Sequence, residues 1–378
     1  MNVIILADNH HNALGLVRSA GISGLNVYVI LNSISCNFLD KSKYIKKCIY
    51  IHDEREILPA ILELTKVIER PLLLSSSEEY AAFVDRNVES LSAYCYVEGG
   101  KHNNSIQKYR SKTIANKLAC EVGFDVPVCF EVDYTNRRNI PTDIKFPLIV
   151  KTSNSVPGWK DAMKTCHDLT ALKSHIENLD EALFPLVVQQ FIEKDYEMLY
   201  VGCSLDAGNT VIAPVGHRKI RHYPNINGLG SYSESFYTGD DKDVSKLIEM
   251  SRQFLAKIQY TGMFSTEFVV AQGHYYFLET NLRNDATSII STRCGFNLVS
   301  LFCDYISGKK VTINKNDYKP RHYMNIVSDI HHMLNGRISP FKWLWQLITA
   351  GAYPYLYVSD IKPSFYYVYY LIKNKFTK

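Results

Sequence analysis

The chain has 378 residues, of which 46% are apolar and 21% charged, as in an ordinary globular protein with a sizeable core. Its net charge of +4 lies wholly beyond residue 340, where five lysines stand against one aspartate. The balanced remainder argues against a nucleic-acid-binding surface as the main function. Nine cysteines without a C-x-x-C pair indicate reduced thiols in a cytoplasmic protein rather than a disulfide framework.

The first hundred residues alternate between apolar runs and helix-like segments. We expect strands at 3–7, 26–31, 48–51 and 71–74, and helices at 12–20, 58–65 and 78–87. Such alternation predicts a parallel sheet covered by helices. The turn after the first strand, residues 8–12, has no glycine, so a G-x-G-x-x-G motif is absent and a nicotinamide cofactor is not expected.

From about residue 106 the pattern shifts toward strands. A helix ending at Gly123 and another at 168–178 accompany extended runs at 126–131, 146–151, 186–192, 197–204, 210–215, 262–270 and 275–281. Strand runs that follow a βα half indicate an α+β part. The expected fold class is therefore α/β plus α+β.

Two acids lie on the last pair of these strands, which flank the turn 272–274. A three-residue loop would set Glu267 opposite Glu279 on one face, whereas a two-residue loop would place them on opposite faces. Opposed carboxylates repel, so a cation between them is expected. Asn281 adds an amide oxygen, which completes a set of hard ligands suited to Mg²⁺ or Mn²⁺. The alternative is a solvated outer face of a hairpin.

The run Phe277-Leu-Glu-Thr-Asn-Leu-Arg283, preceded by Thr266-Glu-Phe268, resembles the metal-binding core of the ATP-grasp superfamily. In that core an acid lies on one strand and Glu-x-Asn-x-Arg on the next. The resemblance covers roughly residues 106–300. It implies an ATP-grasp fold with an N-terminal Rossmann-like (pre-ATP-grasp) domain, ATP and Mg²⁺ (or Mn²⁺) as cofactors, and Glu267, Glu279 and Asn281 as metal ligands.

The resemblance also implies a set of ATP-binding residues. One lysine opens the helix before the Gly123…Pro127 turn, and a second ends the strand that begins with Phe146-Pro147. A hinge would read the adenine with its backbone, and an acid after it would hold the ribose hydroxyls. The loop after the second lysine has a single glycine where the family usually has several, and a lysine there could add charge. These residues are Lys112, Lys151, Lys160, Gln190, Phe191, Ile192 and Glu197.

Four parts of the chain follow from the same resemblance. They are an N-terminal Rossmann-like domain (1–105), an ATP-grasp lid or A–B subdomain (106–187), a metal-binding C subdomain (188–310) and an aromatic and basic C-terminal extension (311–378).

The family's chemistry implies an ADP-forming ligase that joins a carboxylate to an amine through an acyl-phosphate. Arg283 would stabilise the oxyanion, and Lys219 or Arg221 would contact the γ-phosphate and the acyl-phosphate. The alternative for this basic cluster is an exposed strand end. His10, His11 and Asn12 are candidates for substrate contact or ordinary surface residues.

Residues 12–21 and Ser75-Ser-Ser-Glu-Glu-Tyr80 resemble the N-terminal domain of one ATP-grasp branch. That branch includes D-aspartate ligase and proteins associated with cell-surface polysaccharide synthesis. It implies an amino acid or a sugar-linked compound as substrate, and a dimer is compatible with it. The open alternatives are another ATP-grasp acyl or phosphoryl transfer, such as carboxylation through carboxyphosphate or a simple kinase, and a catalytically weak ATP-binding scaffold.

The C-terminal segment 341–378 combines twelve aromatic residues with the surplus lysines. Such a mixture suits the membrane–water interface, which leads to the hypothesis of peripheral attachment at the inner face of a membrane. The alternative is a segment packed on the ATP lobe or forming a dimer contact. Pro354 and Pro363 break the segment into short pieces.

Overall fold

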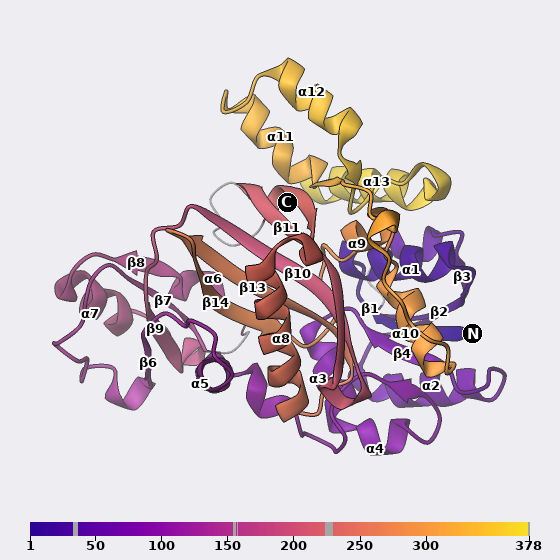
Figure 1. Ribbon diagram of the computed structural model, residues 1–378, viewed down its shortest axis with the longest axis horizontal. Coiled ribbons are helices and arrows are strands. Elements are labelled where there is room, and N and C mark those ends of the chain that lie inside the picture. The colour runs from indigo at the N-terminus through magenta and orange to yellow at the C-terminus, as the bar shows by residue number, and fades with distance from the viewer. Residues whose placement is uncertain (33–36, 154–155, 157, 224–229, 377–378) are drawn as a thin grey trace. The chain divides into compact units, whose positions relative to one another are not determined.

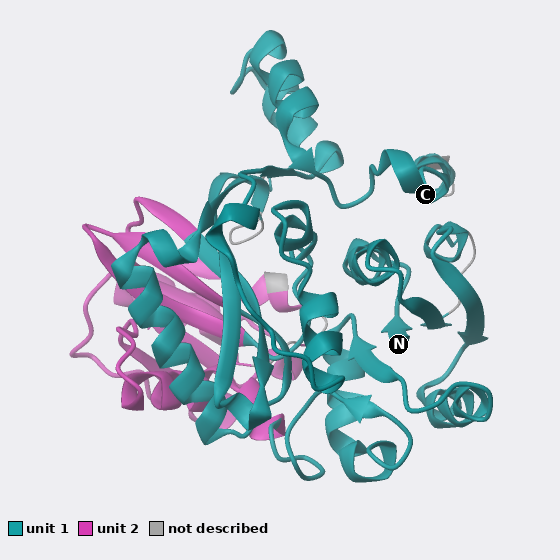
Figure 2. Ribbon diagram, turned by 45° about the vertical axis from the view of Figure 1, so that its right-hand side comes forward, with its two compact units in different colours: residues 1–106, 198–265, 281–378 teal, residues 107–197, 266–280 magenta. Residues whose placement is uncertain are grey.

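The computed structural model describes residues 1–32, 37–153, 156, 158–223 and 230–376, with only the backbone described at Lys160 and at 374–376. The chain forms two compact units (Figure 2). Unit 1 comprises residues 1–106, 198–265 and 281–378, and unit 2 comprises residues 107–197 and 266–280.

Unit 1 contains a five-stranded parallel sheet with the order β3-β2-β1-β4-β5. Its strands are β1 (Asn2–Ala7), β2 (Asn26–Asn32), β3 (Ile45–Ile51), β4 (Leu72–Ser75) and β5 (Tyr96–Val97). The helices between them are α1 (His11–Ile22), α2 (Ile57–Thr65), α3 (Glu78–Arg86) and α4 (Val88–Leu91). The parallel sheet predicted from the alternating pattern is confirmed.

Both faces of this sheet are covered, as the residues of β1 show. Val3 and Ile5 join a buried cluster with α1, whereas Ile4 and Leu6 join a second buried cluster with α2 and α3. Because side chains alternate along a strand, the apolar run at residues 3–7 supplies two helix layers. Figure 1 shows β1 among these helices.

A seven-stranded sheet has the order β14-β13-β10-β11-β12-β15-β16. Its strands are β10 (Tyr196–Leu205), β11 (Thr210–His222), β12 (Gly230–Tyr237), β13 (Gly262–Ala271), β14 (His274–Asn281), β15 (His322–Met324) and β16 (Gly351–Ala352). The boundaries between the two units fall within β10, β13 and β14. The remaining helices of unit 1 are α8 (Lys242–Lys257), α9 (Ile289–Arg293), α10 (Leu298–Ile306), α11 (Ile326–Leu334), α12 (Pro340–Thr349) and α13 (Lys362–Phe376).

Unit 2 contains a four-stranded antiparallel sheet with the order β6-β9-β7-β8. Its elements are α5 (Lys112–Glu121), β6 (Cys129–Val132), β7 (Leu148–Thr152), α6 (Trp159–Ala162), β8 (Lys164–Cys166), α7 (Leu169–Glu177) and β9 (Leu186–Gln190). Val150 and Val188 of the paired strands pack with Leu172 and Ile176 of α7 in one buried cluster. This packing fixes β7, the strand that carries Lys151.

A buried ion pair ties the C-terminal segment to the N-terminal sheet of unit 1. Arg18 on α1 donates from Nε to Asp360 Oδ2 at 3.2 Å, and both side chains are 1% exposed. Asp360 also accepts from Ser42 Oγ at 2.8 Å and from the backbone N–H of Lys43 at 2.9 Å. The guanidinium donates further to the carbonyls of Pro354 and Tyr355. The pair is therefore saturated with hydrogen bonds, as a buried pair must be.

A fully buried histidine lies on β11. His217 Nε2 is 2.9 Å from Thr287 Oγ1, and burial lowers the pKa of this histidine to about 4 against the attraction of Asp285. The positive charge of Lys219 on the same strand contributes to this lowering of the pKa. His217 is therefore neutral in the folded protein at neutral pH.

The first prediction concerns the buried pair. Asp360→Asn leaves the Arg18 cation without a counter-charge, and we expect a loss of roughly 3–5 kcal/mol in the free energy of unfolding, measured by urea denaturation. Arg252→Met is the matched control, because Arg252 pairs with Glu249 on the exposed surface of α8 and should cost at most about 1 kcal/mol. Equal effects in the two variants would contradict the role given to the pair.

The second prediction concerns pH. Below pH 6.5 the unfolded chain protonates His217 while the folded protein does not, so stability falls as the pH drops from 6.5 toward 4. One such proton changes the free energy of unfolding by about 1.4 kcal/mol per pH unit. We expect urea midpoints between pH 7 and pH 5 to fall less steeply in His217→Gln than in wild type. Replacement of the exposed His274 by Gln is the control, and an unchanged slope in His217→Gln would refute the assignment.

Candidate functional site

Two lysines and one carboxylate interact in unit 2. Lys112 opens α5, and its Nζ donates to the carbonyl of Thr152 at 3.4 Å. Lys151 precedes that residue on β7; burial and the positive charge of Lys112 together lower its pKa to about 8, although the carboxylate of Glu279 acts in the opposite direction. The structure thus brings both Lys112 and Glu279 within electrostatic range of Lys151, although the three residues come from three different elements.

The turn of the β13–β14 hairpin consists of two residues, Gln272 and Gly273, both with positive φ. Such a turn alone pairs Phe268 with Phe277, and these rings are indeed in contact, with both packed on Phe124. Two residues farther from the turn on β13, however, Thr266 Oγ1 lies 3.1 Å from Thr280 Oγ1, whereas the turn alone would pair Thr266 with Glu279.

The register therefore changes by one residue along the hairpin. Moving away from the turn, Phe268 and Thr266 are two residues apart on β13. Their partners Phe277 and Thr280 are three residues apart on β14. One extra residue in β14 is the definition of a β-bulge, and in a bulge two successive residues oppose one. The offset therefore places Leu278 and Glu279 together opposite Glu267.

The donor set on this hairpin suits a hard cation. Asn281 donates from Nδ2 to Ser265 Oγ at 3.3 Å, so that bond does not use its carboxamide oxygen, the atom that binds metal. Among the described residues there is no group of three or more His, Cys, Asp and Glu side chains placed to bind a metal. Two carboxylates and an amide fit Mg²⁺, which usually keeps several waters and completes its shell with phosphate.

The predicted adenine hinge follows β9. The N–H of Gln190 donates to the carbonyl of Val128 at 2.8 Å, and the N–H of Phe191 donates to the carbonyl of Pro147 at 3.0 Å. Because these two N–H groups already donate within the protein, the adenine would contact the carbonyls or side chains of Gln190 and Phe191, or the backbone of Ile192. Seven residues after Gln190, Glu197 is 5% exposed at the start of β10 and forms an ion pair with Lys194.

Parts of two loops lie outside the described residues. The side chain of Lys160 is among them, together with residues 154, 155 and 157 of the loop before it and residues 224–229 between β11 and β12. The role suggested for Lys160 stays a prediction from the sequence.

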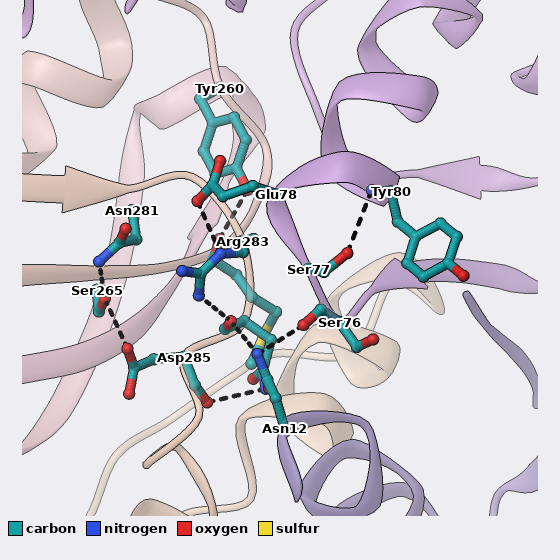
Figure 3. Close-up of polar contacts among 12 residues, drawn as sticks. Asn12, Ser76, Ser77, Glu78, Tyr80, Tyr260, Ser265, Asn281, Arg283 and Asp285 are labelled. Atoms are coloured by element: carbon teal, nitrogen blue, oxygen red, sulfur yellow. Dashed lines mark hydrogen bonds and ion pairs between the residues drawn. The ribbon is translucent and has the colours of Figure 1, made fainter. Parts of the chain in front are cut away.

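Arg283 lies in a polar cluster of unit 1 (Figure 3). Its Nε donates to Glu78 Oε1 at 2.7 Å, and its NH1 donates to the carbonyl of Asn284 at 2.9 Å. Asn284 bonds through its side chain to Asn12, whose Nδ2 donates to the carbonyl of Ser76 at 2.8 Å. The cluster joins the segment after β14 to the carboxyl ends of β1 and β4, and Asn12 acts within it as a structural link.

Asp285 extends this cluster toward β11. It accepts from the backbone N–H of Thr287 at 2.7 Å and from Ser265 Oγ at 3.4 Å. Burial raises its pKa, but Arg283, the Thr287 hydrogen bonds and His217 outweigh that effect, so the net pKa is lowered and the carboxylate is charged. The sequence prediction missed Asp285, although the alternation of polar residues at 279, 281 and 283 could have led to it.

The other predicted basic residues lie on β11. Lys219 is only 7% exposed, so it does not lie at an exposed strand end. Arg221 forms a two-point ion pair with Asp329, at 2.9 and 2.8 Å, and its guanidinium lies over the ring of Tyr232. Trp343 Nε1 donates to the same carboxylate at 3.0 Å, so α12 shares a partner with Arg221.

The two histidines after β1 differ in exposure. His10 is exposed, and its Nδ1 accepts from the backbone N–H of Asn12 at 3.3 Å, whereas His11 is partly buried. His11 Nδ1 is 3.2 Å from the hydroxyl of Tyr355, and burial together with the neighbouring His10 lowers the pKa of His11 to about 3. A tyrosine of the C-terminal segment therefore forms part of the surroundings of this pair.

Comparison with known sequences gives short, distant matches, and no family model matches the chain. It is 22% identical over 205 residues to the carbamoyl phosphate synthase large chain of Saccharolobus solfataricus, over 53% of this chain and 19% of that protein. It is 24% identical over 153 residues to the formate-dependent phosphoribosylglycinamide formyltransferase of Flavobacterium psychrophilum, over 39% of this chain and 38% of that protein. The chain thus spans less than two fifths of the length of these relatives.

Solved structures match over most of the chain. The L-amino acid ligase from Bacillus licheniformis has a TM-score of 0.61 at 17% identity, covering 80% of this chain and 73% of that one. An ADP complex of N5-carboxyaminoimidazole ribonucleotide synthetase has a TM-score of 0.66 at 13% identity, covering 89% and 84%. The biotin carboxylase domain of the Hydrogenobacter thermophilus 2-oxoglutarate carboxylase, with MgADP, ADP and bicarbonate, has a TM-score of 0.66 at 17% identity, covering 84% and 72%. At this level of identity the likeness shows the fold: the chain has the mixed α and β architecture of the ATP-grasp proteins, as the sequence predicts.

Proposed function

We propose that the chain is an ATP- and Mg²⁺-dependent ligase that joins a carboxylate to an amine through an acyl-phosphate and releases ADP and phosphate. The observation that carries this proposal is the interacting group of Lys112, Lys151 and Glu279 on a chain with this fold. Phosphoryl transfer depends mostly on positioning and on cancelling charge, and two cations beside a metal-binding carboxylate suit a triphosphate.

The chemistry needs ATP because a carboxylate is a poor electrophile. Transfer of the γ-phosphoryl group to a carboxylate oxygen breaks the bond to ADP and forms a mixed anhydride. The amine then attacks the acyl carbon, loses a proton and expels phosphate, which leaves the amide. Exclusion of water protects the anhydride from hydrolysis.

The nucleotide roles follow chain order. Lys112 and Lys151 would bind phosphate oxygens, and Lys160 would add charge from the loop. The hinge at Gln190, Phe191 and Ile192 would bind the adenine, and Glu197 would hold the ribose hydroxyls. The burial of Glu197 supports this last role, because a buried carboxylate accepts hydrogen bonds in a fixed direction.

Glu267, Glu279 and Asn281 would hold Mg²⁺, which when bound neutralises charge on the phosphates. Arg283, whose guanidinium is oriented by Glu78, would stabilise the developing oxyanion through a charge-assisted hydrogen bond. Lys219 and Arg221 would bind the γ-phosphate and the acyl-phosphate, and Asp329 would fix the direction of Arg221.

A second candidate reaction is carboxylation through carboxyphosphate, which the biotin carboxylase neighbour with its bound bicarbonate favours. Both reactions release ADP and phosphate, so the identity of the activated acid separates them. A weakly active scaffold is the remaining alternative, and it predicts slow ADP release with every acid offered.

We further propose a small carboxylate and a small amine as substrates, one of them an amino acid or a sugar-linked compound, in cell-wall or surface-polysaccharide modification. This setting rests on the likeness of residues 12–21 and 75–80 to the D-aspartate ligase branch. It calls for a cytoplasmic location, with access to the inner face of a membrane if the acceptor is lipid-linked, and for a monomer or a dimer.

The third prediction tests the metal assignment. In Glu279→Gln we expect ATP turnover to fall roughly 100-fold or more, because the amide cannot replace the carboxylate on the cation. MgADP should raise the melting temperature of wild type by mass action and that of the variant much less. The control is Glu69→Gln, at an exposed position, and turnover in Glu279→Gln equal to that of the control would exclude the metal role.

The fourth prediction tests the acyl-phosphate. With hydroxylamine in place of the amine, the acid substrate should be trapped as a hydroxamate with one ADP and one phosphate released. A screen over amino acids, uronic acids, nucleotide-linked glycans and bicarbonate identifies the acid. Release of AMP and pyrophosphate would contradict the mechanism, and ADP release that depends on bicarbonate alone would favour carboxylation.

A further inference from the structure

Exposed apolar side chains gather at the C-terminal end of the chain. Of the twenty large hydrophobic residues exposed in the described part of the chain, ten lie between residues 341 and 372. A gathering of this density marks an interaction surface rather than chance exposure of single residues. Nine of the ten residues belong to α12 and α13. Figure 1 labels these two helices.

Helix α12 presents an apolar outer face. Phe341, Leu344, Trp345 and Ile348 follow the i, i+3, i+4, i+7 pattern of a single helix face, and Phe341 is 88% exposed. The opposite face is anchored, because Trp343 is buried and donates to Asp329.

Helix α13 repeats the arrangement. Phe365, Val368, Tyr369 and Ile372 have the same spacing, and each is more than half exposed. On the inner side Tyr367 stacks on Tyr355 with ring centroids 3.4 Å apart. Each of the two helices therefore packs on unit 1 through one face. The opposite face of each helix is apolar and exposed to solvent.

The charge around these faces is positive. The only acid from residue 341 to the end is Asp360, which is buried against Arg18. Lys342 and Lys362 are exposed beside the two faces. Near α13, Lys43 is exposed. Lys41 lies over the ring of Tyr366 at 5.2 Å from its centroid, but its charge is paired with Asp40.

We propose that the outer faces of α12 and α13 bind an anionic lipid surface, with both helices lying in the plane of the membrane interface. Aromatic and aliphatic side chains on one side with lysines at the margin are the composition of interfacial helices, in which rings lie at headgroup level and ammonium groups meet lipid phosphates. A protein–protein contact of this apolarity is usually depleted of lysine, which favours lipid over a second copy.

The helices lie on the membrane and do not cross it. Helix α12 has 10 residues and α13 has 15, and no helix in the described part of the chain is long and apolar enough for a span. Surface attachment needs no such length, because an interfacial helix buries one face only. The inference stands independently of the ligase reaction, since none of these outer-face residues has a proposed catalytic role.

The test uses the full-length protein and flotation with two kinds of vesicle, phosphatidylcholine alone and phosphatidylcholine with phosphatidylglycerol. We expect co-flotation with the anionic vesicles and at least a tenfold weaker association at high salt, because salt screens the lysine–phosphate attraction. Trp345 serves as a native reporter, whose emission should shift to shorter wavelength on binding.

Two double variants and one control complete the design. Trp345→Ser with Ile348→Ser on α12, and Val368→Ser with Ile372→Ser on α13, should each reduce vesicle binding at least tenfold while ATP turnover and melting temperature stay near wild type. Val67→Ser with Ile22→Ser removes exposed apolar residues elsewhere and should bind as wild type does. The proposal would be overturned if the wild-type protein did not bind anionic vesicles at low salt. It would also be overturned if the protein formed a concentration-dependent dimer that the α12 and α13 substitutions convert to monomer.

Discussion

Polar side chains stand at every second residue from 279 to 285. Both the group of charges around Lys151 and the polar cluster around Arg283 depend on this spacing. Glu279 interacts with Lys151 of unit 2, whereas Arg283 bonds to Glu78 of α3 and Asp285 interacts with His217 of β11, both in unit 1. Each of these groups is charged and at least partly withdrawn from water, so each needs a partner of opposite charge. A shift of one residue in this short segment would remove every partner at once.

The bulge in β14 sets which residues of that strand lie opposite β13. A two-residue turn is a favoured connection for a hairpin, yet by itself it would leave the two acids on opposite faces. One additional residue between Phe277 and Thr280 brings Glu279 opposite Glu267 in spite of that turn. The Phe124–Phe268–Phe277 packing holds the register on the turn side of the bulge, and the Thr266–Thr280 contact holds it on the other.

Much of the fold could be predicted from the sequence, because it rests on short-range patterns. Four strands of the N-terminal sheet and the two hairpin strands follow from apolar runs, and the structure has each of these six within a few residues of the expected bounds. The short fifth strand, β5, is not among the expected ones. The sequence could not reveal contacts between distant residues. Arg18 on a helix is typical of a surface residue until Asp360 is placed beside it, and Glu78 has no evident role until Arg283 reaches it. The roles of the ATP-binding and metal-binding residues stay predictions.

The Arg18–Asp360 pair also has a consequence for the order in which the protein forms. Its partners are 342 positions apart in the chain. At a synthesis rate of about 5–20 residues per second, Arg18 leaves the ribosome tens of seconds before Asp360 does. Throughout that interval α1 carries a guanidinium that has no counter-charge and cannot be buried at low cost. The N-terminal sheet, although first to be made, therefore reaches its final packing only after the C-terminal segment has arrived.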